Sequence, residues 1–133
     1  MKDPVTEADR WLKQSLHNLA IAQGHKGRAE YAEACFVSEQ AAQMALKAYL
    51  TLKGERFILA HSVRKLVEKC AVFDPALAEL IEPGKILDKY YLTTRYPDVL
   101  PSPAVPWESF TEKEAGEAVA YAEKIVQLVQ RQF

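Results

Sequence analysis

Residues 28–53, RAEYAEACFVSEQAAQMALKAYLTLK, decide the fold of this chain. Their apolar side chains cover more than one face of a helix, and many of them are alanines, which let neighbouring helices approach closely. Gly54 ends the pattern. Glu33, Gln40 and Lys47 lie seven residues apart, so they fall within about 40° of one another around a helix axis. We therefore expect a central helix, mostly buried, that keeps one polar stripe.

Amphipathic helices are predicted on both sides of this stretch. Asp3-Pro4 places a capping residue before proline at a helix start, and apolar residues recur every three or four positions from Trp11 until Gly24 and Gly27 end the pattern. At the other end of the chain, Thr111 and Glu114 have the spacing of a capping box before an apolar stripe that runs to residue 129.

Two shorter helices are predicted between these segments. His61-Ser62 begins one, and Asp74-Pro75 begins another, which should kink or break at Pro83 and continue to about residue 94. Residues 95–110 hold four of the seven prolines and are expected to form a long loop that packs over the bundle, Trp107 included.

The fold class follows from these elements: an all-α, antiparallel up-and-down bundle of about five helices, with residues 1–133 as one domain. Apolar residues make up 49% of the chain and charged residues 26%, as in ordinary globular domains. The first ten residues are too polar for a signal peptide, and no apolar run is long enough to span a membrane. We expect a cytoplasmic protein with Cys35 and Cys70 as buried free thiols and no membrane contact.

Composition and motifs exclude several kinds of site. The net charge of −1 gives no overall attraction to polyanions, although residues 47–95 carry 9 Lys and Arg against 6 Asp and Glu. The chain has no glycine-rich phosphate loop, no paired-cysteine motif, no HExxH and no GxSxG. Neither a metal site nor a cofactor is predicted.

Five segments, in order, resemble the HEPN domain family over about residues 8–130. They are WLKQSLHNLAIA at 11–22, AEYAEACFVSEQAAQMALKAYLTLKG at 29–54, HSVRKL at 61–66, YYLTTRYPD at 90–98 and TEKEAGEAVAYAEKIV at 111–126. The chain departs from the family pattern at Ser15 and Asn18, where members often have Ala and Asp, and at Glu39, where they often have a second Gln.

The resemblance implies a HEPN-like bundle and leaves open whether the protein is an enzyme. HEPN proteins are associated with nucleotide binding, and small stand-alone members are commonly paired with a minimal nucleotidyltransferase, often as toxin and antitoxin. Many HEPN domains are metal-independent endoribonucleases that use an Arg, four to six residues and a His from two protomers of a dimer.

Arg56 and His61 have the spacing of that catalytic pair. A histidine can act as acid or base on a 2′-hydroxyl, and an arginine can hold the scissile phosphate. However, the four residues between them are apolar, and the family motif lies later, where Arg95 has no following His. His61 has an alternative structural role at the start of a helix.

Gln40, Lys47, Arg95 and Tyr96 are the predicted ligand-binding residues, lining a groove for a phosphate or nucleotide. Structural alternatives remain: Lys47 could reach solvent or pair with a surface carboxylate, and Arg95 could tie down the loop through backbone carbonyls and Asp98. We expect a homodimer and, as the leading function, a non-catalytic or weakly catalytic nucleotide- or RNA-associated module that acts with a nucleotidyltransferase. The alternatives are a ribonuclease toxin and a structural interaction module.

Overall fold

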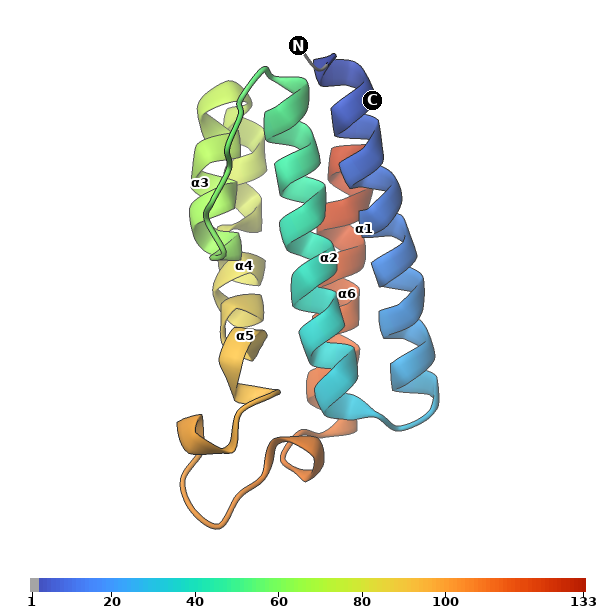
Figure 1. The fold of residues 1–133 in the computed structure, drawn as a ribbon, viewed down its shortest axis with the longest axis vertical. Coiled ribbons are helices and arrows are strands. Elements are labelled where there is room, and N and C mark those ends of the chain that lie inside the picture. The colour runs from blue at the N-terminus through green and yellow to red at the C-terminus, as the bar shows by residue number, and fades with distance from the viewer. Residues whose placement is uncertain (1–2) are drawn as a thin grey trace.

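The computed structural model describes residues 3–133 and contains only helices and loops within them. α2 (Tyr31–Leu52) stands in the middle and contacts each of the other α-helices. Figure 1 shows α1 (Pro4–Gly27) antiparallel beside it, α6 (Glu112–Gln130) behind these two, and the shorter helices along the other side. The all-α bundle predicted from the sequence is confirmed within these residues.

The helix starts follow the predicted capping residues. Asp3 accepts a hydrogen bond from the Thr6 amide, Ser62 from the Lys65 amide, and Thr111 and Glu114 form the capping box of α6. These caps satisfy amide groups that have no partner within the helix.

The fourth predicted helix is interrupted, but before Pro83 rather than at it. A 3-10 helix (Pro75–Leu80) follows α3 (Val63–Phe73), and α4 then begins at Ile81 and ends at Asp88. Pro83 therefore lies in the first turn of α4, where its missing N–H costs no hydrogen bond. A short α5 (Tyr90–Thr93) completes this arm.

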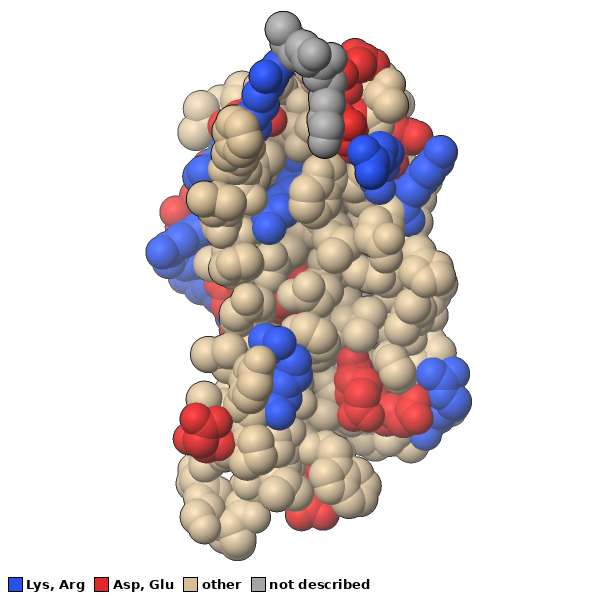
Figure 2. All heavy atoms as spheres, in the orientation of Figure 1, with Lys and Arg blue, Asp and Glu red and all other residues tan. Residues whose placement is uncertain are grey.

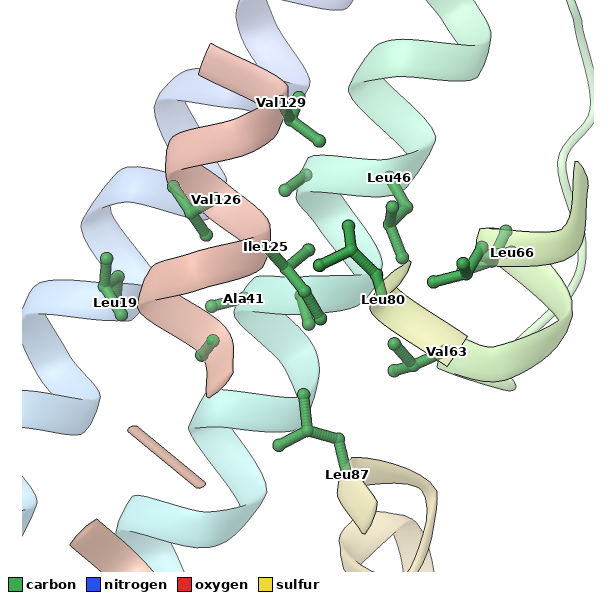
Figure 3. Close-up of a cluster of buried hydrophobic side chains, with 14 of the residues drawn as sticks. Leu19, Ala41, Leu46, Val63, Leu66, Leu80, Leu87, Ile125, Val126 and Val129 are labelled. Carbon is green, nitrogen blue, oxygen red and sulfur yellow. The ribbon is translucent and has the colours of Figure 1, made fainter. Parts of the chain in front are cut away.

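The hydrophobic core lies around α2. Leu46 belongs to one buried cluster with Ile125 from α6, Leu80 from the 3-10 helix, and Val63 and Leu66 from α3 (Figure 3). Alanines fill much of the remaining α2 surface, and Cys35 and Cys70 are buried free cysteines, as predicted. Burial of both sides of α2 leaves one narrow strip of the helix free for polar residues.

Residues 95–110 form the predicted long loop at one end of the bundle, with 3-10 turns at Pro97–Val99 and Pro106–Glu108. Pro106 is buried, but the Trp107 side chain is 73% exposed. The expectation that Trp107 packs over the bundle is wrong, because the 3-10 turn that buries the proline directs the next side chain outward.

Candidate functional site: a groove along α2

One face of α2 carries a row of polar and aromatic side chains. Phe36, Gln40, Gln43, Lys47 and Thr51 are spaced by three or four residues, which places them on one side of the helix. None of them belongs to the hydrophobic core cluster. We call this row and its walls the α2 groove. In Figure 2 the face over α1 and α2 is largely tan, with a few charged side chains recessed between uncharged ones.

Lys47 is the buried cation of the groove. Its side chain is 8% exposed, and its Nζ lies 5.8 Å from the centre of the Trp11 ring on α1. Burial lowers the pKa of Lys47, while the nearby Glu39 carboxylate raises it. Lys47 therefore does not extend into solvent or pair with a surface carboxylate, and its ammonium group would interact strongly with an anion in this partly dehydrated position.

Glu39 directly precedes Gln40 on α2, and the sequence did not predict it as a site residue. It is fully buried, and burial raises its pKa to about 7, even though hydrogen bonds from Gln43 and Gln40 favour the ionised form. The signal was present in the sequence, since Glu39, Gln43 and Lys47 follow one another at four-residue spacing. However, that spacing is also common on solvent-exposed helix faces, so the sequence alone does not distinguish a buried polar cluster from an exposed one.

Arg95 lies beside the Phe36 end of the row. Its guanidinium donates hydrogen bonds from Nε and Nη2 to the Tyr91 carbonyl, at 3.0 and 2.6 Å. Its Cζ lies 4.4 Å from the ring centre of Phe36, 5.1 Å from that of Tyr91 and 4.9 Å from that of Tyr96. The three aromatic rings hold an exposed cation in place, and Asp98 is not needed to do so.

His61 belongs to the same group of side chains. Its ring stacks on Tyr91 with the ring centres 5.5 Å apart and the planes 19° from parallel. The segment is anchored directly after His61, because Asp88 accepts hydrogen bonds from the Ser62 hydroxyl and the Val63 and Arg64 amides. His61 and Arg95 therefore share Tyr91 as a common neighbour.

Arg56 lies elsewhere. Figure 1 shows the segment between α2 and α3 running from one end of the bundle down the side of α3, with Arg56 near its beginning and His61 near its end. Arg56 lines an apolar hollow of about 560 Å³ together with Trp11, Phe57 and Ile58. Within one chain, Arg56 and His61, the predicted catalytic pair, therefore lie at different points along this segment.

The same segment exposes large apolar side chains beside the hollow. Phe57 is 90% exposed and Leu59 is 79% exposed. Phe57 also has a φ of +57°, a backbone conformation that residues other than glycine rarely adopt. Exposed apolar groups beside an apolar hollow are typical of a surface that contacts another molecule.

Two further observations concern residues 3–133 only. They contain no group of three or more His, Cys, Asp and Glu side chains arranged to hold a metal ion. None of their helices is both long and apolar enough to cross a membrane.

Comparison with known proteins gives one consistent result. The family model described as HEPN domain matches residues 8–132. Among curated proteins, Sacsin from Homo sapiens is 30% identical over 119 residues, which is 85% of this chain and 2% of Sacsin. The chain thus spans a very small part of that relative's length.

Solved structures are similar over nearly their whole length. The crystal structure of TT1696 from Thermus thermophilus has a TM-score of 0.88 and 39% identity, covering 95% of this chain and 98% of that one. ST0689, an archaeal HEPN homologue, has a TM-score of 0.77 and 33% identity, covering 99% and 98%. A HEPN domain protein from Thermotoga maritima has a TM-score of 0.74 and 28% identity, covering 92% and 96%.

Proposed function

This chain belongs to the HEPN domain family, and from that premise we propose that it binds a nucleotide or a short stretch of RNA in the α2 groove. We further propose that it does so as the partner of a minimal nucleotidyltransferase, in a pair of the toxin–antitoxin kind. The observation that supports the proposal is the polar row on α2, which has Lys47 beside the Trp11 ring towards one end and Arg95 over the Phe36 ring at the other.

The groove offers the two kinds of contact that nucleotides require. Lys47 and Arg95 supply positive charge for phosphate oxygens. Tyr96 and His61 are exposed aromatic rings near Arg95, which suit stacking against a base. Gln40 lies on α2 between Phe36, which Arg95 covers, and Lys47. Its side-chain amide can form hydrogen bonds with the edge of the base.

A ligand-dependent shift in melting temperature tests this site. ATP, GTP and a short single-stranded RNA should each be titrated, because a ligand that binds only the folded state raises its melting temperature. Lys47→Met, which keeps the side-chain stem, and Arg95→Ala should each lower the affinity at least tenfold. Lys53→Met and Arg10→Ala remove exposed cations outside the groove and serve as matched controls.

RNA binding that depends on these cations should also weaken as salt concentration rises. If none of the ligands shifts the melting temperature, or if the control variants lose as much affinity as the groove variants, the proposal is refuted. A structural interaction module would then be the better account.

The dimer that we propose uses the apolar hollow and the side chains beside it. In a two-fold dimer the same surface meets itself, so Phe57 and Leu59 of each copy would cover the hollow of the other. Such a contact would also bring Arg56 of one protomer towards the α2 groove of its partner. Sedimentation analysis should show a dimer that Phe57→Ser dissociates, while Trp107→Ser, at the far end of the bundle, leaves it intact.

The nucleotidyltransferase partnership has its own test. The protein should co-purify with a minimal nucleotidyltransferase encoded beside it when the two are expressed together. A neighbouring gene of another kind, together with failure of the two proteins to associate, would remove this part of the proposal and leave the groove untouched.

A metal-independent ribonuclease is the second candidate, and the shared contact of His61 and Arg95 with Tyr91 favours it. His61 would act as acid or base on the 2′-hydroxyl, and Arg95, or Arg56 from a second protomer, would hold the phosphate. The protein should then cleave a mixed RNA pool in the presence of EDTA. His61→Ala should abolish this cleavage and His17→Ala, on the exposed side of α1, should not. Equal cleavage by His61→Ala and the parent would end this assignment.

A further inference from the structure

The buried carboxylate of Glu39 is held by two glutamines. Its Oε1 accepts a hydrogen bond of 2.8 Å from Gln40 Nε2, and its Oε2 accepts one from Gln43 Nε2. An ionised carboxylate can only accept hydrogen bonds, so each glutamine must turn its amino group towards Glu39. As a consequence, each amide must turn its carbonyl oxygen away from Glu39.

These two carbonyl oxygens remain available to a ligand. Gln40 is half-buried and Gln43 is 4% exposed, and the hydrogen bonds within residues 3–133 include none that either Oε1 accepts. Ser38 Oγ is the one side-chain polar atom in that part of the chain that is both fully buried and without a partner. The carbonyl oxygens of Gln40 and Gln43 therefore keep an opening to the α2 groove.

Lys47 follows Gln43 by one helical turn, so the groove presents hydrogen-bond acceptors at one point and a cation at another. From Gln40 to Lys47 the helix rises about 10 Å, at about 1.5 Å per residue. A mononucleotide likewise carries its base and its phosphates at opposite ends. The base would meet the glutamine carbonyls while the phosphates meet Lys47.

We infer that Glu39 is a positioning residue that fixes the orientation of Gln40 and Gln43, so that the groove selects bases with an exocyclic amino group over bases with a carbonyl at the same place. The inference rests on the proposed nucleotide site. An amino group donates to a glutamine carbonyl, whereas a base carbonyl at the same place would face it oxygen to oxygen and would pair only by moving to the second N–H of the amide nitrogen. Adenine is therefore preferred over hypoxanthine, and cytosine over uracil.

The structural setting makes this orientation firm. Glu39 is buried in the middle of α2, and the nearby charges of Asp88 on α4 and Arg95 after α5 affect its ionisation in opposite directions. At pH 8, where Glu39 is mostly ionised, turning either amide around would place a carbonyl oxygen against a buried carboxylate. Surface glutamines, by contrast, turn freely and select neither kind of base.

Isothermal titration at pH 8, with ATP against ITP and CTP against UTP, tests the inference. These pairs differ chiefly in an amino group against a carbonyl. The parent protein should bind the amino-bearing member of each pair at least tenfold more tightly. Glu39→Gln can both donate and accept, so it frees the amides to turn and should reduce each ratio to less than threefold while binding itself persists.

Two further variants separate this role from general damage. Gln40→Met should weaken ATP binding and leave ITP binding nearly unchanged, because it removes one acceptor and keeps the shape. Glu79→Gln, an exposed carboxylate on the 3-10 helix, should keep the full preference of the parent. A parent that binds both members equally, or a Glu39→Gln variant as selective as the parent, overturns the inference and leaves the proposed function standing. Absence of binding to all four nucleotides would overturn the inference, and the proposed function falls with it only if GTP and single-stranded RNA also fail to bind.

Discussion

Replacing Glu39 by glutamine should make the protein more stable, and by an amount that grows with pH. The folded state raises the Glu39 pKa from 4.5 to about 7, mainly through burial, so folding favours the protonated carboxyl group. Below pH 4.5 the group is protonated in both states and costs nothing. As pH rises from 4.5 to 7 the unfolded state ionises first, and the folded state loses stability relative to it.

The magnitude follows from the two pKa values. A change in the Glu39 pKa from 4.5 to about 7 corresponds to about 3 kcal/mol, of which linkage gives about 1 kcal/mol at pH 5 and nearly the whole at pH 8. The stability advantage of Glu39→Gln should therefore increase by about 2–3 kcal/mol between pH 5 and pH 8. For a chain of 133 residues this is about 9 °C in melting temperature.

Urea unfolding followed by circular dichroism at pH 5, 6, 7 and 8 measures the difference between parent and variant directly. Other titrating groups are the same in both proteins, so their contributions largely cancel in the difference. Glu79→Gln removes an exposed carboxylate and should show a flat difference over the same range. A flat difference for Glu39→Gln would refute the reasoning, since it would mean that Glu39 ionises as freely in the folded state as in the unfolded one.

Three other substitutions test the packing and the helix starts by urea unfolding at pH 7. Gly84→Ala should cost about 1–3 kcal/mol, because its Cβ would lie 3.0 Å from the Arg64 backbone nitrogen, where α4 touches α3; no loss would mean that the two helices separate easily. Asp88→Ala should cost about 1–3 kcal/mol, since it removes the acceptor for the first amides of α3 and for Ser62, and retention of full stability would contradict this role. Thr111→Ala should cost about 1 kcal/mol by removing the α6 cap, whereas the neighbouring Lys113→Ala should cost less than about 0.5 kcal/mol.

The sequence predicted the fold well because its local signals agree with one another. Asp3-Pro4, Ser62 and Thr111 begin helices where the structure begins them, and the apolar pattern of residues 28–53 identified α2 as the centre. Each of these signals depends on residues within a few positions of one another. Local chemistry therefore suffices to predict them.

The groove was predictable only in part, because it forms between segments distant in the chain. Gln40 and Lys47 could be placed on one helix face from their spacing. That Trp11 covers Lys47, and that Arg95 reaches Phe36, depends on how α1 and the end of α5 pack against α2. Periodicity carries no information on such contacts, so a buried cation and a surface cation give the same pattern.

Three costly features of this chain occur on the surfaces proposed to bind other molecules, whereas Ala29, which also has a positive φ, lies in the turn between α1 and α2. Glu39 lowers the stability of the folded state at neutral pH. Phe57 has a left-handed backbone conformation and an exposed ring. Lys47 is a cation that is almost completely buried. Glutamine at 39 or a polar residue at 57 would each relieve a cost without disturbing the core. Residues that reduce the stability of the folded state are found mainly at functional sites, where a ligand or a partner needs them. If variants free of these three features keep the ligand affinity, the base preference and the assembly of the parent, the groove and the hollow beside it have no function that requires them.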